Sequence, residues 1–237
     1  MALLMVLDHL DHIPGLLRPE TAALFHALSR CVGVWFAYMA VEGFVHTRSR
    51  PRYTLRLLGW GAAMALGDRL YNMLGAPYGL SMSNNIFLTL GVGVAILDLL
   101  AVTDPRHPPT GTINKLLRTA GAAVLLAAGI LFTEGGIVIL PFLLLAYRFR
   151  GRPLPFVLSC LGLSALLFAL TFHAYPTLWE TLLMLGFNSD FLFITVLPFL
   201  ALYNGQRGPS GPFAKYFFYL FYPAHLWVIG LIALRCA

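Results

Sequence analysis

Two short stretches place titratable side chains inside otherwise apolar sequence. The first, MVLDHLDHIPG, carries Asp8, His9, Asp11 and His12 just before a proline and a glycine. An ionised aspartate near the centre of a bilayer costs about 2.5 to 3.5 kcal/mol, so its presence there indicates a use. A carboxylate beside an imidazole can fix the tautomer of the ring and raise its basicity, as a general base requires. We therefore interpret Asp8 and His9 as candidate functional residues, and we expect Asp11 and His12 to be solvated at the membrane interface.

The second stretch is KYFFYLFYPAHLW, which begins at Lys215. A histidine at membrane depth either serves a function or is packed and bonded to a neighbouring carbonyl, and the sequence leaves both interpretations open for His225. Lys215, Tyr219 and Tyr222 fall on nearly one face of the predicted helix. They are expected to form a polar line from the cytoplasmic end of this helix up to the level of His225.

The second apolar run adds charged residues at two depths. Arg30 is expected near the middle of the bilayer, where it needs an anion, and Asp8 is the natural candidate. Glu42 and His46, four residues apart, are expected at the cytoplasmic end. They are either solvated and paired with the arginines that follow, or part of a binding site.

The composition indicates that the helices which position these residues lie in a membrane. Of 237 residues, 59% are hydrophobic and 11% are charged, which is far from the composition of a soluble protein. Apolar runs recur between breaks rich in proline, glycine or arginine. They predict an all-α, polytopic bundle of about nine transmembrane helices, of which those around Glu134 and around Gly186 to Asp190 could be re-entrant or broken. The runs are 2–16, 22–46, 56–74, 84–103, 117–132, 136–149, 154–173, 179–203 and 213–234.

Positive charge predicts the orientation of the bundle. Basic residues gather in alternate connections, which are expected to be cytoplasmic. The N-terminus is then cytoplasmic and the C-terminus outside. Because this topology and the attraction to anionic lipid account for the net charge of +6, a nucleic-acid partner is not expected. The four basic connections contain Arg48, Arg50, Arg52 and Arg56; Arg106, Lys115 and Arg118; Arg148, Arg150 and Arg152; and Arg207 with Lys215.

Five motifs together resemble the TraX family of integral-membrane acetyltransferases. They are DHLDH, EGFVHTRSRPRYTLRLL from Glu42, NNIFLTLG from Asn84, YNGQRG from Tyr203 and KYFFYLFYPAHL from Lys215. The resemblance covers nearly the whole chain and implies one acyltransferase-like domain over residues 1–237. Two motifs depart from the family pattern: Gly33 and Val34 stand where Phe-Pro is usual, and TEGG replaces Asp-Tyr-Gly at residue 133.

The resemblance implies an acetyl-CoA-dependent O- or N-acyltransferase of the bacterial inner membrane. Such an enzyme takes acetyl from cytoplasmic acetyl-CoA and passes it to an acceptor across the bilayer. In the best-known relatives the acceptor is the N-terminus of a pilin, while here a small molecule, a glycan or a protein N-terminus would serve. No resident cofactor and no metal are expected.

The resemblance also suggests roles for the residues found above. His9 would be the base or a transient acyl carrier oriented by Asp8, and His225 with Tyr222 would donate to the thioester oxygen. Positively charged side chains would bind the CoA phosphates. The predicted CoA ligands are Arg48, Arg52, Arg56, Arg207, Lys215 and Tyr219, and the predicted acceptor-binding residues are Arg30, Glu42 and Asn85.

Two other classes of function remain open. His9 and His12 have a tolerable spacing for an intramembrane metal site. Alternatively, Asp8, Arg30, Asp68 and Arg69 could form a relay in a proton-coupled small-molecule or lipid carrier, although the internal repeats common in transporters are absent from the sequence. Acetyl-CoA binding separates the enzyme from the carrier, and metal analysis separates it from the metalloprotein.

Overall fold

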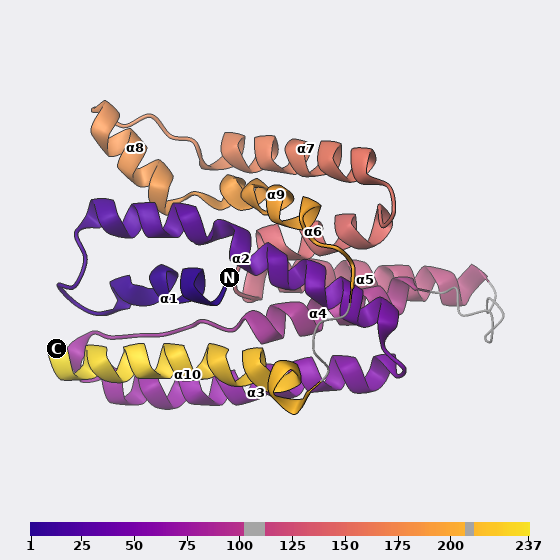
Figure 1. Ribbon diagram of the computed structural model, residues 1–237, viewed down its shortest axis with the longest axis horizontal. Helices are drawn as coiled ribbons and strands as arrows, with labels where there is room; N and C mark the ends of the chain where they lie inside the picture. Colours follow the sequence, from indigo (N-terminus) through magenta and orange to yellow (C-terminus); the bar gives the residue numbers. More distant parts are fainter. Residues whose placement is uncertain (102–111, 207–210) are drawn as a thin grey trace. The chain divides into compact units, whose positions relative to one another are not determined.

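The described residues of the computed structural model are 1–101, 112–206 and 211–237, and they form helices without any strand (Figure 1). The predicted all-α class is confirmed for this part of the chain. The elements are α1 Ala2–His9, η1 Leu10–His12, α2 Pro19–His46, α3 Arg50–Gly75, η2 Ala76–Tyr78, α4 Ile86–Leu100, α5 Thr112–Phe132, α6 Gly136–Arg148, α7 Pro153–Thr171, α8 Leu178–Phe187, η3 Asp190–Thr195, α9 Val196–Ala201 and α10 Pro212–Cys236.

Fewer helices can cross a membrane than the apolar runs predicted. Among the described residues four helices are long and apolar enough, in α2, α5, α7 and α10, or five if the bent pair formed by α8 and η3–α9 is one span. The predicted count of nine is not supported. Each apolar run does contain a helix, but α1, α4 and α6 have only 8, 15 and 13 residues, and a span needs about 20.

The predicted break near Gly186 to Asp190 is confirmed. The helices on either side of it meet at an angle of 60°. The first of them, α8, starts from a capping box in which Thr177 and Glu180 satisfy each other's backbone N–H groups. Gly186 lets α8 approach α2 closely, because a Cβ there would lie 2.9 Å from the Cβ of Ala23. The break therefore follows a helix that is fixed at its start and packed near its end.

The chain packs as two compact units. Unit 1 consists of Met1–Trp35, Asp68–Met82 and Val157–Ala237, and unit 2 of Phe36–Gly67 and Ser83–Phe156. Each unit draws on separate stretches of sequence, so neither corresponds to a contiguous segment that could be cut out as a domain.

In unit 1 the short N-terminal helix is held against α10. Ile13, Ile229 and Ala233 form a buried cluster, with partly buried hydrophobic residues packed around it. Figure 1 shows α1 lying beside α10. This packing matters for the site, because it brings the histidines at the end of α1 to the level of His225 on α10. The surrounding residues are Val6, Leu10 and Leu80.

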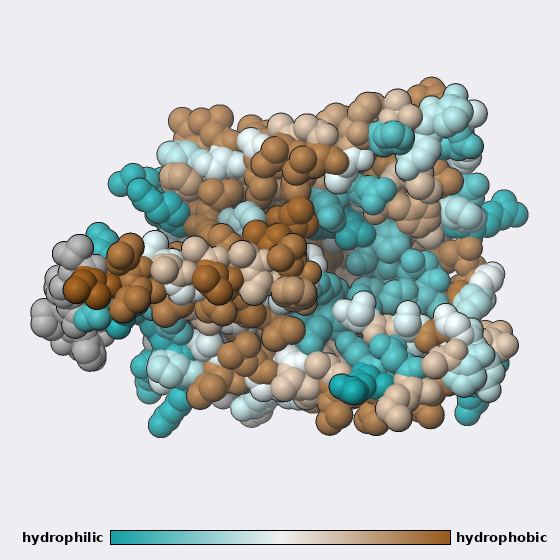
Figure 2. Space-filling model, turned by 180° about the vertical axis from the view of Figure 1, so that it is seen from behind, coloured by the Kyte–Doolittle hydropathy of each residue, from teal (hydrophilic) through white to brown (hydrophobic). Residues whose placement is uncertain are grey.

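In unit 2 the helices α4, α5 and α6 pack on one another. Gly136 permits the close approach of α6 to α5, because a Cβ at this position would overlap the carbonyl oxygen of Gly129. The hydroxyl of Thr89, which is fully buried, donates to the carbonyl of Glu134 at 2.8 Å and ties α4 to the same turn. The other face of α5 is exposed and apolar, as the brown residues along this helix at the left of Figure 2 show. Such a face suits contact with lipid.

Asn72 closes the connection after α3 and gives a test of the fold. Its amide donates to the carbonyl of Met82 at 2.9 Å and accepts from the backbone N–H of the same residue at 2.7 Å. Replacing it by alanine would leave two backbone groups without these partners. Asn72→Ala is therefore expected to lower the free energy of unfolding by about 1 to 3 kcal/mol. Thermal unfolding in detergent micelles would measure this, and an unchanged midpoint would contradict it.

Candidate active site

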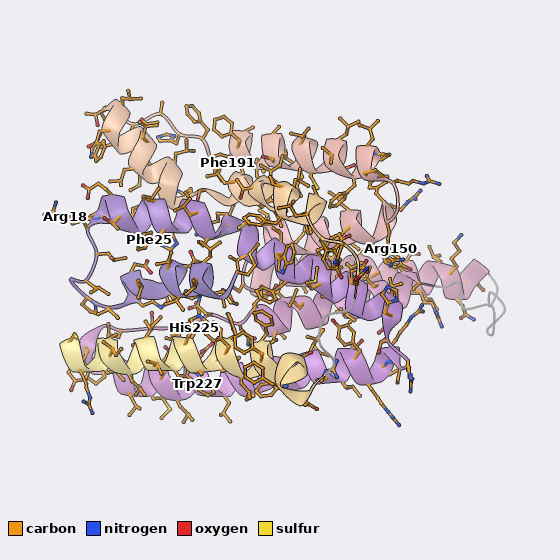
Figure 3. All side chains as sticks on the ribbon, in the orientation of Figure 1. Arg18, Phe25, Arg150, Phe191, His225 and Trp227 are labelled. Carbon is orange, nitrogen blue, oxygen red and sulfur yellow. The ribbon has the colours of Figure 1, made fainter. Side chains whose placement is uncertain are left out.

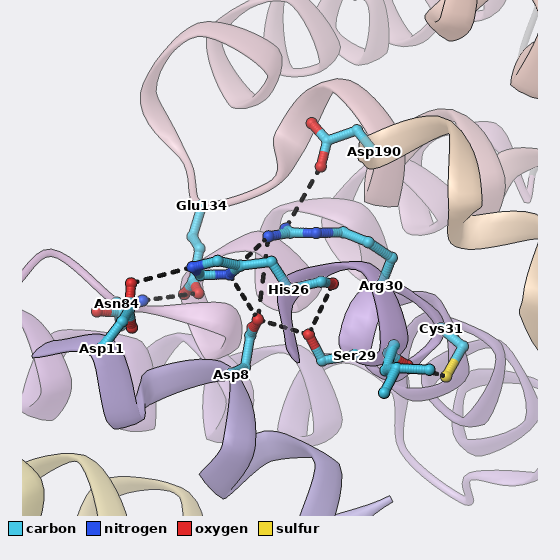
Figure 4. Close-up of polar contacts among 10 residues, drawn as sticks. Asp8, Asp11, His26, Ser29, Arg30, Cys31, Asn84, Glu134 and Asp190 are labelled. Atoms are coloured by element: carbon cyan, nitrogen blue, oxygen red, sulfur yellow. Dashed lines mark hydrogen bonds and ion pairs between the residues drawn. The ribbon is translucent and has the colours of Figure 1, made fainter. Parts of the chain in front are cut away.

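The centre of the site is an imidazole between two carboxylates. His26, in the second turn of α2, has Nδ1 2.9 Å from Oδ1 of Asp8 and Nε2 3.0 Å from Oδ2 of Asp11 (Figure 4). Asp8 lies in the last turn of α1 and Asp11 in η1. One side chain of α2 thus bonds to both elements that precede it in the chain.

Other residues extend this cluster into a charged network. Ser29 donates its hydroxyl hydrogen to Oδ1 of Asp8. Arg30 lies 3.9 Å from the same oxygen through Nη2 and donates to Asp190 at 3.4 Å through Nη1. The predicted pairing of Arg30 with Asp8 is confirmed. Asp190 adds a second anion from η3, directly after the break in the helix.

Three histidine rings meet where α1 packs on α10. The ring centroid of His9 lies 5.4 Å from that of His12 and 5.5 Å from that of His225. His9 and His225 are 7% and 8% exposed. Their contact places the two histidines at the same level of unit 1. In Figure 3, His225 and Trp227 lie on different sides of α10, and only Trp227 is exposed.

The hydrogen bonds of His225 determine which ring nitrogen is free. Nδ1 lies 3.0 Å from the carbonyl oxygen of Phe221, so in the neutral ring Nδ1 carries the hydrogen and Nε2 carries a lone pair. Nε2 is buried and has no hydrogen-bond partner among the residues that the structure describes. The ring stacks on Phe221, and Tyr222 meets it edge to face at 5.5 Å between centroids. The interpretation of His225 as a packed ring bonded to a neighbouring carbonyl is confirmed for Nδ1, while a function for Nε2 stays a prediction.

The predicted pairing of Asp8 with His9 is not found. Within the described segments no hydrogen bond joins these two side chains, and the carboxylate of Asp8 is bonded to His26 and Ser29 instead. Adjacent residues of a helix point in directions about 100° apart, so they do not face each other. The expectation that Asp11 is solvated holds only in part: its side chain is 28% exposed, but Oδ2 bonds to His26 and Oδ1 is buried.

The predicted acceptor-binding residues of unit 2 have other bonds. Asn85 caps α4 by accepting from Leu88 N–H, and it donates to the carbonyl of Gly61 at 2.8 Å. These bonds explain its burial without a substrate. Glu42 forms a two-point ion pair with Arg150, at 3.0 and 3.3 Å, which is the pairing with a later arginine that the sequence left open. These hydrogen bonds raise the pKa of Arg150, so it stays positively charged.

The predicted CoA ligands are placed only in part. Arg48 and Arg52 are exposed, and the guanidinium of Arg56 lies 5.4 Å from the ring centroid of Tyr53. Tyr219 is half-buried. Arg207 and the side chain of Lys215 lie outside the described residues, as does Arg106 of the predicted basic connections. Lys115 and Arg118 belong to α5 rather than to a loop.

The sequence interpretation missed His26, Ser29 and Asp190 as members of the site. His26 and Ser29 precede Arg30 by four residues and by one, and His26 therefore shares the helix face of Arg30. Asp190 lies in the break that the sequence indicated. Attention to the i, i+4 neighbours of an arginine in an apolar run could have found His26.

The structure also bears on the metal site and on the carrier relay that the sequence left open. In the described part of the chain no group of three or more His, Cys, Asp or Glu side chains has the geometry to hold a metal ion. Of the proposed relay, Asp68 is 7% exposed and its Oδ1 has no partner within the described ranges, while Arg69 is exposed.

One comparison with known proteins shows a family match. The sequence profile of the family described as TraX protein matches residues 1–233. No curated protein and no solved structure matches the chain.

Proposed function

The chain belongs to the TraX family, and from this premise we propose that it is a membrane-embedded acyltransferase. It would transfer acetyl from acetyl-CoA to an amine or hydroxyl of an acceptor. The observation that carries this proposal is the buried Nε2 of His225, which has a lone pair and belongs to a ring whose centroid lies 5.5 Å from that of His9. A bare imidazole nitrogen in a buried site is the group that acyl transfer needs as a base.

His225 is the base in this proposal. Its Nε2 takes the proton of the acceptor N–H or O–H while the acceptor atom attacks the thioester carbonyl. When the tetrahedral intermediate collapses, the C–S bond breaks and the proton returns to the CoA sulfur, so that CoA leaves as the thiol. The role of donor to the thioester oxygen, predicted for His225, suits the neutral ring poorly, because its only N–H is bonded to Phe221.

His9 and Tyr222 complete the proposed reaction site. The His9 ring lies within contact distance of His225 and stays the second candidate for base or acyl carrier. Tyr222 is buried against His225, and a phenol there can donate to a developing oxyanion. Arg30 and the network around it would then hold the α1 end of the site in place.

The wider arrangement follows from the sequence. The exposed arginines Arg48 and Arg52, with Arg56, remain the proposed ligands of the CoA phosphates on the cytoplasmic side. The N-terminus would be cytoplasmic and the C-terminus outside, in the inner membrane of a bacterium. The acceptor would be a small molecule, a glycan or a protein N-terminus such as that of a pilin.

A proton-coupled carrier is the second candidate. The buried Asp68, whose Oδ1 has no partner among the described residues, is the observation that favours it, because buried carboxylates of this kind mark proton pathways in transporters. Such a carrier would not need acetyl-CoA.

Binding of the acetyl donor separates the two candidates. Acetyl-CoA or CoA at about 100 times its dissociation constant is expected to stabilise the detergent-solubilised protein by about 2.7 kcal/mol, and ATP is expected to leave it unchanged. The measurement is a thermal shift, which requires no knowledge of the acceptor. Folded protein that responds to none of these ligands would favour the carrier.

A further inference from the structure

Only a charged His26 ring can donate a hydrogen bond to both of the carboxylates beside it. Each of its nitrogens is within 3.0 Å of a carboxylate oxygen, from Asp8 on one side and Asp11 on the other. A neutral imidazole has one N–H and one lone pair, so one of the two carboxylates would face the lone pair. An imidazolium has two N–H donors and can bond to both.

The alternative is a neutral His26 that accepts from Arg30, whose Nη2 lies 3.1 Å from Nδ1. The oxygen of Asp8 next to Nδ1 would then have to carry a proton. That oxygen already accepts from the Ser29 hydroxyl and lies 3.9 Å from Arg30. Both contacts favour the ionised carboxylate, so the proton belongs on His26.

Enough carboxylates surround His26 to balance the positive charges of both His26 and Arg30. Asp8 of α1 and Asp11 of η1 contact the ring, and Asp190 of η3 pairs with Arg30 at 3.4 Å. Three carboxylates thus accompany two cations. From α8 the ring meets Phe187, at 5.7 Å between centroids, which carries no charge.

We propose that His26 is an imidazolium that clamps α1 and η1 onto α2, and that it is a positioning residue which sets His9 against His225. The clamp acts on both sides of His9, because Asp8 precedes this residue and Asp11 follows it two positions later. No other side chain of α2 bonds to both carboxylates among the described residues. The second half of this inference rests on the proposed acyl transfer, whereas the first half does not.

The charge of His26 can be measured without any activity. The whole protein, labelled with ¹⁵N-histidine and held in detergent micelles, contains seven histidines. The His26 signals are those that disappear in His26→Arg. At pH 8 an ordinary histidine, with a pKa of about 6.5, is neutral. We expect the shifts of His26 at that pH to be those of a ring protonated on both nitrogens, and shifts of a neutral ring would overturn the inference.

The positioning role has its own readout. CoA release from acetyl-CoA, with a short peptide bearing a free amino terminus as acceptor, gives kcat and KM. His26→Gln removes the charge and is expected to lower kcat about 10- to 100-fold with little change in KM for acetyl-CoA. His26→Arg restores a permanent cation with N–H groups on several sides, and most of kcat should return with it. The exposed His173 gives the matched control, His173→Gln, which should behave as wild type.

The outcomes separate this inference from the proposed function. The positioning role would be refuted if kcat of His26→Arg were no higher than that of His26→Gln, or if His26→Gln had the wild-type kcat. If the wild-type protein neither transfers acetyl to the peptide nor is stabilised by acetyl-CoA, the proposed function fails, and the nitrogen shifts alone then decide whether His26 is a charged clamp. A thermal shift with acetyl-CoA checks that each variant is folded.

Discussion

His225→Gln is expected to lower the rate of acetyl transfer by about 10²- to 10⁴-fold, the range that general-base catalysis contributes. Glutamine is close to histidine in size and can still donate to the carbonyl of Phe221, the contact that His225 makes at 3.0 Å. It offers no basic nitrogen at the position of Nε2. The measurement is kcat from the release of CoA thiol, together with the thermal shift produced by acetyl-CoA. Turnover should fall while the ligand-induced shift persists.

The controls for this experiment come from the other histidines. His173→Gln changes an exposed histidine in the same unit and should leave kcat unchanged. His9→Gln distinguishes the two candidate bases, because substitution of the neighbour should lower kcat less than substitution of the base itself. If His225→Gln turned over at the wild-type rate while His9→Gln did not, His9 would be the base. Full activity in both variants would remove the histidine pair from the mechanism.

Asp8→Ala is expected to cause the largest loss of stability among single substitutions in the charged network. It leaves His26, Ser29 and Arg30 without the oxygen that all three approach. Removing one partner of a fully buried ion pair costs about 3 to 5 kcal/mol. The side chain of Asp8 is 23% exposed, so solvent should reduce the cost to about 2 to 4 kcal/mol. Unfolding in detergent micelles, followed by heat or denaturant, measures the difference.

The matched control is Glu20→Ala, which removes an exposed carboxylate near the start of α2. A surface substitution of this kind should change stability by about 0.5 kcal/mol or less. Equal unfolding midpoints for the two variants would mean that the network contributes little to the fold. If only Asp8→Ala lowers the stability, the effect is due to the network and not to the change in net charge.

Part of the site could be predicted from the sequence because polar residues in apolar runs are conspicuous. His9, Asp8, Arg30 and His225 were found in this way, and the pairing of Arg30 with Asp8 followed from the need of a buried cation for an anion. The other partners of these residues, His26 and Asp190, could not be predicted from the sequence in the same way. His26 comes from a different helix than the carboxylates it bridges, and Asp190 lies 160 residues from Arg30.

The number of spans shows a second limit of sequence reasoning. Hydropathy located the apolar runs, and each of them contains a helix. It did not determine where these helices end, since their termini depend on caps and turns such as Asn85 at the start of α4 and Gly135, with φ of 60°, before α6. Two runs of expected membrane length therefore became helices of 15 and 13 residues.

The sequence by itself determined the helical class, the presence of apolar helices suited to a membrane and the family, and it indicated some of the candidate site residues, because these depend on local composition and on the order of short motifs. Only the tertiary structure decided which side chains meet. The packing of α1 on α10 brings His9 to His225, and a hydrogen bond to Phe221 leaves Nε2 of His225 as the free nitrogen. Long-range contacts of this kind depend on how helices pack, which hydropathy and periodicity along one chain do not encode.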